Sequence, residues 1–205
     1  MGYTTDFYGG FEVTPTLNEP HRLYLKAFNE TRRMKRDPEI AATLPDPLRE
    51  AVGLPIGPDG AYFVGGIGYM GQDHDTSVVD YNQPPGITPM EHGSLETFHE
   101  QYETYLGMRQ QAILDGAQPG LWCQWVPTED GTGIVWDGGE KFYDYVEWLR
   151  YLIHRFLAPW GYKLSGEVEW EGEDHDDFGK IVVNKNQVEV FVGHREYAKE
   201  EGATT

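Results

Sequence analysis

The stretch that decides the fold is 141-KFYDYVEWLRYLIHRFLAPWGYKLSGEVEWEG-172, the centre of a longer segment from Gly120 to Val192. In its first half, apolar residues recur every three or four positions, which is the spacing of one face of an α-helix. The residues of this face are Phe142, Tyr145, Val146, Leu149, Leu152, Ile153 and Phe156. The pattern predicts a core helix. Asp137 and Glu140 have the spacing of a capping box, so we expect the helix to begin just after Asp137.

Strands are predicted on both sides of this helix. Residues 164–171 alternate between apolar and polar side chains, which is the period of a strand with one buried and one solvated face. Two hairpins are predicted from β-prone runs that turn residues separate. Their strands are residues 121–126 with 134–136, and residues 180–183 with 187–192.

The first 117 residues carry weaker signals. Asn18 precedes a helical pattern that is expected to close in the basic run 32–36, because cations favour the negative end of a helix dipole. A polar helical segment between two Pro-Gly turns predicts a helical insertion at about residues 87–117. Short strands are predicted at residues 11–13, 61–64 and 77–81.

These patterns together predict an α+β fold of two layers, a mainly antiparallel sheet with helices packed on one face. The chain of 205 residues is long enough to bury one such core. We therefore expect residues 1–192 to form a single domain that carries the insertion, and residues 193–205 to form a polar tail.

The composition predicts a cytoplasmic protein. No apolar run approaches the roughly 20 residues that span a bilayer, and the first residues lack the pattern of an export signal. The single cysteine, Cys123, cannot form an internal disulfide, and its neighbours Trp122 and Trp125 favour a packed thiol in a reducing compartment.

The charge argues against polyanionic partners. The chain has 34 acidic and 16 basic residues, a net charge of -18, which disfavours direct contact with nucleic acid or with an anionic membrane. A protein partner or a small molecule fits this charge better.

One candidate ligand site combines a basic run, a loop and a Trp-rich strand. Guanidinium groups recognise phosphates, and an indole that cannot share the core with its neighbour is free to stack on a base or a sugar. Capping of the helix end and burial of the indoles under the insertion are the alternatives. The candidate ligand-binding residues are Arg32, Arg33, Arg36, Asp80, Asn82, Trp122, Gln124 and Trp125.

A candidate partner site lies on the predicted strand 164–171. Its polar positions are acidic, and carboxylates this dense repel one another unless they meet a basic partner. A solvated acidic face is the alternative. The candidate partner-binding residues are Glu167, Glu169, Glu171 and Asp174.

A third cluster, Asp73, His74 and Asp75 with the nearby Asp80, has the residue types of a metal or acid–base site. Its spacing matches no metal motif, and a solvated loop explains it equally well. We therefore assign no metal, no cofactor and no catalytic residue from the sequence.

Three segments carry a resemblance to a known group. They are residues 1–7 (MGYTTDF), residues 77–85 (SVVDYNQPP) and the block from Gly120 to Val183. Across about two thirds of its length the chain resembles uncharacterised acidic proteins of bacteria and their phages. The resemblance implies a phage or mobile-element setting and no catalytic residues.

Two hypotheses of function follow. The first is a non-enzymatic cytoplasmic protein, encoded by a phage, that binds a host partner through its acidic and aromatic surface. The second is a protein that binds or hydrolyses a nucleotide-like small molecule, in a pocket formed by the basic run and the Asp80 loop.

Overall fold

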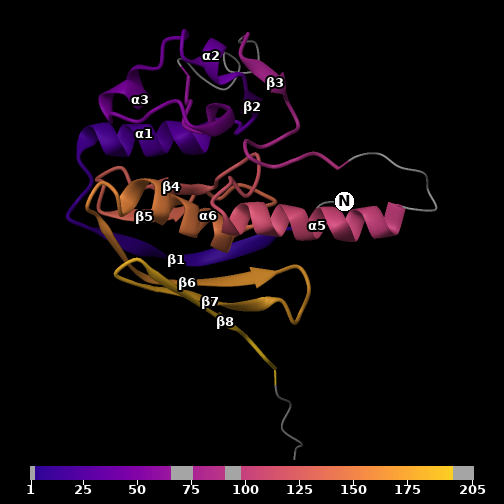
Figure 1. The fold of residues 1–205 in the computed structure, drawn as a ribbon. Coiled ribbons are helices and arrows are strands. Elements are labelled where there is room, and N and C mark those ends of the chain that lie inside the picture. The colour runs from indigo at the N-terminus through magenta and orange to yellow at the C-terminus, as the bar shows by residue number, and fades with distance from the viewer. Residues whose placement is uncertain (1–2, 66–75, 91–97, 196–205) are drawn as a thin grey trace, which may run out of the picture.

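The computed structural model describes residues 3–65, 76–90 and 98–195, and it confirms the predicted α+β class (Figure 1). A six-stranded antiparallel sheet has the strand order β4-β5-β1-β6-β7-β8. Its strands are β1 (Thr5–Thr14), β4 (Trp125–Pro127), β5 (Gly133–Trp136), β6 (Lys163–Gly172), β7 (Phe178–Asn184) and β8 (Gln187–Val192).

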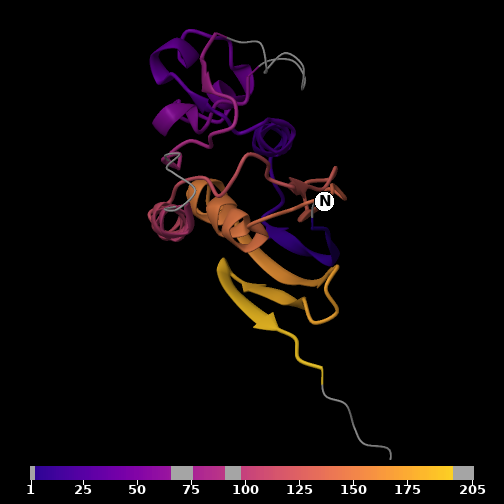
Figure 2. The same cartoon turned by 90° about the vertical axis from the view of Figure 1, so that its right-hand side faces the viewer.

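Helices α1 (Glu19–Glu30) and α6 (Tyr145–Leu152) pack on one face of this sheet (Figures 1 and 2). Residues 31–65 and 76–90 lie beyond these helices and form a cap on them. The cap contains β2 (Lys35–Arg36), α2 (Pro38–Ala41), α3 (Pro47–Ala51), a 3-10 turn at Pro58–Gly60, and β3 (Val78–Asp80).

Strands β1 and β6 form the centre of the sheet and pair along their full length, from Thr5 opposite Gly172 to Thr14 opposite Lys163. Both strands alternate as the period of two requires: on β6, Leu164, Val168 and Trp170 are buried while the acidic positions between them are exposed. The alternation predicted for residues 164–171 is confirmed.

Two glycines allow the central strands to approach closely. Gly9 has φ +105, and a Cβ there would lie 2.6 Å from the carbonyl oxygen of Glu167. Gly166 has φ +139, and a Cβ there would lie 2.7 Å from the carbonyl oxygen of Gly10. Both sites therefore require glycine.

The hairpin of β7 and β8 also follows the prediction. Its turn residues Lys185 and Asn186 have φ of 48 and 73, which are the two left-handed positions of a type I′ turn. The other hairpin is shorter than expected, because β4 includes only the last residues of the run 121–126.

The core helix begins later than the capping-box pattern predicts. It starts at Tyr145, after Asp144 in a left-handed conformation, and continues as a π-helix at Ile153–Leu157. Asp137 instead accepts hydrogen bonds from the Gly139 N–H at 2.8 Å and from the Asn29 side chain at 2.8 Å. Phe142 precedes the helix but is buried, as expected, with its ring 5.4 Å from that of Trp125.

Two other predictions for the cap are wrong. The first helix ends at Glu30 rather than in the basic run, because Lys35 and Arg36 pair with β3 and form β2. Ala61, Phe63 and Val64 are buried, but residues 61–64 form no strand. The strand predicted at residues 77–81 is present as β3.

Helix α5 (Phe98–Leu114) falls in the region predicted as an insertion and projects sideways from the body (Figures 1 and 2). It is longer than α6, yet none of its described side chains is buried. Large apolar side chains remain exposed along it, namely those of Tyr102, Leu106, Met108 and Leu114.

A cavity between helices α5 and α6 as the candidate functional site

The candidate site is a cavity of about 680 Å³ between α5, the start of α6 and the segment before β4, which we name the α5–α6 cavity. It brings together three of the predicted ligand residues, Asn82, Trp122 and Gln124. These residues come from the cap and from the segment that leads into the sheet, so the cavity lies where cap, helix layer and α5 meet.

Aromatic side chains supply much of its wall. They come from α5, from the segment before α6 and from α6 itself: Tyr102, Tyr105, Trp122, Tyr143 and Trp148. The Trp148 side chain is fully buried and lies behind the other rings, whereas that of Tyr143 is 54% exposed. Such a wall favours a flat apolar ligand, because rings stack on rings.

Arg32 stands at the margin of the cavity. Its Nε donates to the Tyr81 carbonyl oxygen at 3.0 Å and its Nη2 to Asn82 Oδ1 at 3.3 Å. Its guanidinium carbon lies 4.0 Å from the centre of the Tyr81 ring and 5.9 Å from that of the Trp122 ring. Within the described ranges, no carboxylate lies at ion-pair distance from Arg32. This side chain is therefore a cation held in place by neutral groups.

Helix α5 is tied to the rest of the cavity by an ion pair. Arg109 donates from Nη2 to Asp144 Oδ2 at 2.5 Å and from Nη1 to Oδ1 at 3.3 Å, and it also binds the carbonyl oxygen of Pro119. Although partial burial lowers the pKa of Arg109, the Asp144 carboxylate outweighs this effect and raises it. Asp144 precedes α6 but makes no capping bond there, so its carboxylate serves α5 instead.

Gln124 is a positioning residue of the cavity. Its Nε2 donates to the Glu140 carbonyl oxygen at 2.9 Å, and its Oε1 accepts from the Trp136 indole at 3.0 Å. These bonds fix the loop that presents Glu140 and Lys141 at the cavity.

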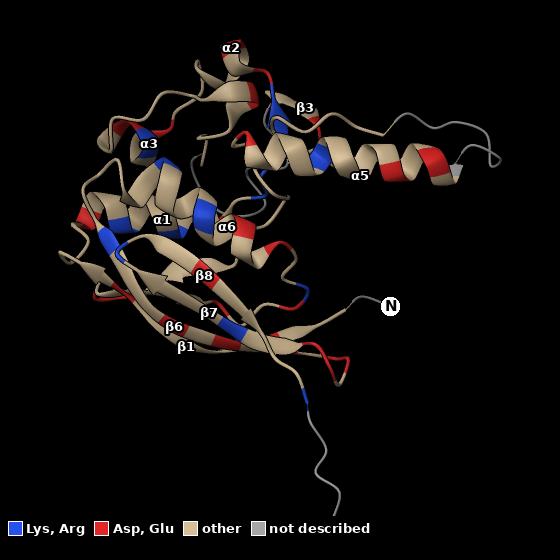
Figure 3. Cartoon of the chain, turned by 60° about the horizontal axis from the view of Figure 1, so that its bottom comes forward, with Lys and Arg blue, Asp and Glu red and all other residues tan. Residues whose placement is uncertain are grey.

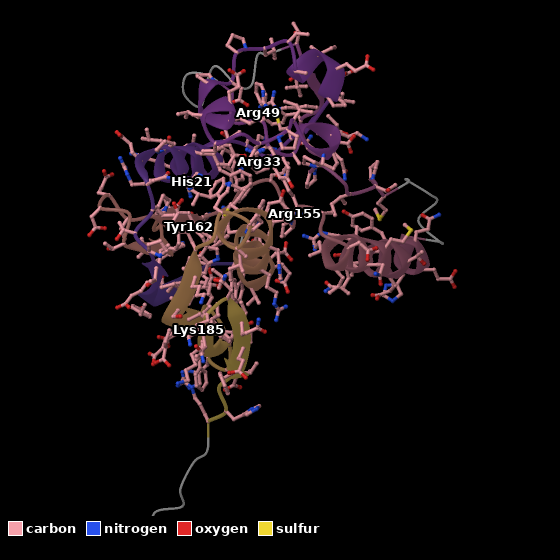
Figure 4. The ribbon with its side chains drawn as sticks, turned by 60° about the vertical axis from the view of Figure 1, so that its left-hand side comes forward. His21, Arg33, Arg49, Arg155, Tyr162 and Lys185 are labelled. Atoms are coloured by element: carbon pink, nitrogen blue, oxygen red, sulfur yellow. The ribbon has the colours of Figure 1, made fainter. Side chains whose placement is uncertain are left out.

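Three of the predicted ligand residues lie in the interior instead. Arg33 is 2% exposed, and its Nη2 donates to the carbonyl oxygens of Ala61 at 2.6 Å and Phe63 at 2.8 Å. Figure 4 shows it inside the molecule, below Arg49. Arg36 is 1% exposed and donates from Nη1 to Ser77 Oγ at 3.0 Å. Neither arginine therefore lies at the surface, as the predicted ligand site requires, and these hydrogen bonds join parts of the cap to one another.

Burial costs a charged group solvation, and it lowers the pKa of Arg33 to about 10. The side chain therefore remains charged at neutral pH. The ring of Phe28 lies 4.2 Å from its guanidinium carbon, and Gln118 Oε1 accepts from its Nε at 3.3 Å. Neutral acceptors and a ring face thus replace part of the water that Arg33 loses, while its Nη1 has no hydrogen-bond partner among the described residues.

The third interior residue is Trp125. It is 1% exposed, packs edge-on against Phe7 and Phe11, and donates from its indole to the Tyr145 carbonyl oxygen at 2.7 Å. The nearby Trp122 lies before β4 and is only partly buried. Asp80, on β3, lies outside the cavity and accepts from the Asn82 N–H at 2.9 Å.

The acidic residues of β6 are exposed, as predicted, and none of them lines the cavity. Figure 3 shows acidic positions along β6, within the sheet. Glu167 pairs with Lys180 at 3.0 Å and Glu171 with Arg195 at 3.8 Å. Asp174 is also exposed, and its N–H donates to the Tyr3 hydroxyl at 3.1 Å. Part of the stripe is therefore offset by cations of the same chain.

The cavity residues of α5 and of the turn before α6 were not predicted from the sequence as site residues. Tyr102, Tyr105 and Arg109 share one face of α5, and this spacing is the signal in the sequence that could have indicated a site. Asp144 gave no local signal, because its role depends on Arg109, 35 residues earlier.

The remaining candidates for chemistry are the predicted Asp73, His74 and Asp75 cluster and the thiol of Cys123. Asp73, His74 and Asp75 lie outside the described residues. In the ranges that are described, no group of three His, Cys, Asp or Glu side chains is arranged to hold a metal ion. Burial raises the pKa of Cys123 to about 12, so its thiol stays protonated near neutral pH.

Comparisons with protein-family models, with curated proteins and with solved structures give no match. The resemblance to acidic proteins of bacteria and their phages therefore stays a prediction. Among the described helices, none combines the length and the apolar character needed to cross a bilayer.

Proposed function

We propose that the protein is a cytoplasmic binding protein that holds a small planar anion, such as a nucleotide or an aromatic carboxylate, in the α5–α6 cavity. The observation that carries this proposal is the placement of Arg32, a cation stacked on Tyr81 and bonded to Asn82 at the margin of an aromatic cavity. The resemblance in sequence adds a phage setting, in which the bound molecule belongs to the host.

The chemistry of the cavity matches such a ligand in two ways. Trp122 and the tyrosines offer ring faces for stacking. A guanidinium has five N–H donors, and Arg32 uses two of them on Tyr81 and Asn82, so the others are available for an oxyanion. Because the chain has 34 acidic residues and only 16 basic ones, Arg32 is a selective point of attachment for an anion.

Calorimetric titration with adenosine monophosphate, adenosine and benzoate tests the proposal. We expect the nucleotide to bind about tenfold more tightly than the nucleoside, because a hydrogen bond to a charged group contributes about 1.5–3 kcal/mol. Arg32→Ala should bring the nucleotide down to the affinity of the nucleoside.

Arg22→Ala is the matched control, since Arg22 is an α1 arginine whose partner is Glu129 at 3.9 Å, away from the cavity. It should leave binding unchanged. The proposal fails if none of the three compounds binds at millimolar concentration, or if both variants weaken binding equally.

Docking of a basic protein partner on the acidic sheet face is a second candidate, supported by one observation. A groove of about 430 Å³ on this face brings the exposed rings of Tyr8 and Phe191 next to Glu169. Aromatic rings are typical of the centre of an interface, and charged residues are typical of its rim. Charge reversal at Glu167, Glu169 and Glu171 should abolish such docking, and an unchanged affinity for a basic partner protein would reject it.

A further inference from the structure

The two end strands of the sheet differ in how open they are to pairing. Strand β4 has three residues and ends in Pro127, which has no N–H to donate. Strand β8 has six residues, contains no proline and exposes Val190 by 38%, Phe191 by 49% and Val192 by 63%. A long apolar end strand of this kind is a template for another strand.

The direction of the backbone groups on β8 is defined by its pairing with β7. Gly193 N–H donates to the carbonyl oxygen of Phe178 on β7, and Gln187 pairs with Asn184 across the turn. Because backbone groups alternate in direction along a strand, residues 187, 189, 191 and 193 point toward β7. Val188, Val190 and Val192 therefore point their N–H and C=O groups out of the sheet.

We propose that β8 pairs antiparallel with β8 of a second copy of this chain, about a two-fold axis at Val190. Val190 then lies opposite Val190 of the second copy, and Val188 lies opposite Val192 of the second copy. Each of these valines donates and accepts across the new edge. The same register brings the exposed valines of both copies together on the sheet face that carries Ile181 and Val183.

Charge favours a second copy in this register. Glu189 is the only charged residue of β8, so the strand avoids the acid-to-acid contact that most of this surface would impose. The pairing places Glu189 of one copy opposite Phe191 of the other. Lys180, which pairs with Glu167, lies on the far side of that phenylalanine with its ammonium 5.9 Å from the ring centre, so a cation stands between the acidic residues of β6 and the incoming carboxylate. The interface is isologous, as in most homodimers.

Sedimentation equilibrium of the full chain measures the association. We expect a monomer–dimer equilibrium that strengthens with added salt, because salt screens the repulsion between two chains of charge -18. Val190→Lys should weaken the dimer at least tenfold, since two lysines meet at the axis. Val79→Lys is the matched control, because Val79 is a 59% exposed valine on β3, and this variant should dimerise normally.

A cysteine at the axis tests the register itself. The only native cysteine is buried, so Val190→Cys adds one reactive thiol, and directly opposed Cα atoms about 5.5 Å apart suit a disulfide. Mild oxidation should link Val190→Cys into a dimer faster than Val79→Cys, although position 79 is the more exposed.

Three results would overturn the proposal. They are a monomer at all concentrations and salt levels, a dimer that Val190→Lys leaves intact while circular dichroism shows it folded, and equal cross-linking of the two cysteine variants. A monomer that takes up a β-strand peptide from another source would assign this edge to a different occupant.

Discussion

Helices α5 and α6 lie beside the same cavity but contribute differently to the stability of the fold. Helix α6 has eight residues, of which Trp148, Leu149, Tyr151 and Leu152 are buried. Helix α5 has seventeen residues, and none of its described side chains is buried. The comparison shows that helix length does not measure a contribution to the core: α6 holds the fold, whereas α5 forms one wall of the cavity.

The largest expected effect is on the free energy of unfolding, when a leucine of each helix is replaced by alanine. Leu149→Ala should lower the free energy of unfolding by about 2–5 kcal/mol, because it leaves a void at a fully buried position. Leu106→Ala, on α5 and 37% exposed, should change it by less than about 0.5 kcal/mol. Urea denaturation of the two variants measures both values, and equal losses would contradict the distinction.

A smaller effect is expected at the ion pair that joins the helices. Arg109→Ala should cost about 1.5–3 kcal/mol of local stability, since it removes charge-assisted bonds and leaves Asp144 without its cation. Hydrogen exchange should then accelerate in α5 and stay unchanged in α6.

The matched control for this prediction is Arg150→Ala. Arg150 forms a looser pair with Glu147 at 3.8 Å, its side chain is 45% exposed, and such pairs contribute about 0–1 kcal/mol. If exchange accelerates in α6 as much as in α5 after Arg109→Ala, then α5 is part of the core after all.

The role of the cavity in binding can be tested at the indole of Trp122. Trp122→Ala should weaken binding of a planar anion by about 1–3 kcal/mol, because a stacking face is lost. The control is Trp160→Ala, whose ring stacks on His21 at 4.0 Å outside the cavity. Titration calorimetry compares the two variants, and the stacking role is rejected if they behave alike.

The sheet was predictable from sequence because its signals are local. The alternation along β6 and the turn residues Lys185 and Asn186 are both contained within a few neighbouring positions. The start of α6 was not predictable, because Asp137 has the right spacing for a cap but bonds to Asn29, which is 108 residues away.

The cavity was predictable only in part. Polar and aromatic residues beside turns are typical of a site, and this pattern indicated four residues that lie at the cavity. Asn82, Trp122 and Gln124 line the cavity, and Arg32 lies at its margin. The burial of Arg33 left no trace in the sequence, since the carbonyl oxygens that accept its bonds belong to residues about 30 positions later. A basic run therefore gave the same pattern for Arg32 and Lys35, which are partly exposed, and for Arg33 and Arg36, which lie in the interior.

The boundary between the core and the cavity passes through residues 122–125, where Trp122 and Gln124 line the cavity while Cys123 and Trp125 face the core. Burial raises the pKa of the Cys123 thiol to about 12 from the usual value near 9. The unfolded chain therefore loses this proton first as the pH rises, so folding stability must fall above about pH 9. Between pH 7 and pH 9.5 the loss from this thiol should be on the order of 1 kcal/mol, and Cys123→Ala should remove it.

A thiol reagent tests the same boundary directly. Cys123 should stay unreactive in the folded protein at pH 8, and it should stay unreactive in Arg109→Ala, because loosening α5 opens the cavity and not the core. Rapid labelling of Arg109→Ala, with the unmutated chain still protected, would show that α5 shields the core. The contrast between the two helices would then be one of degree, since both would keep water from the same segment before β4.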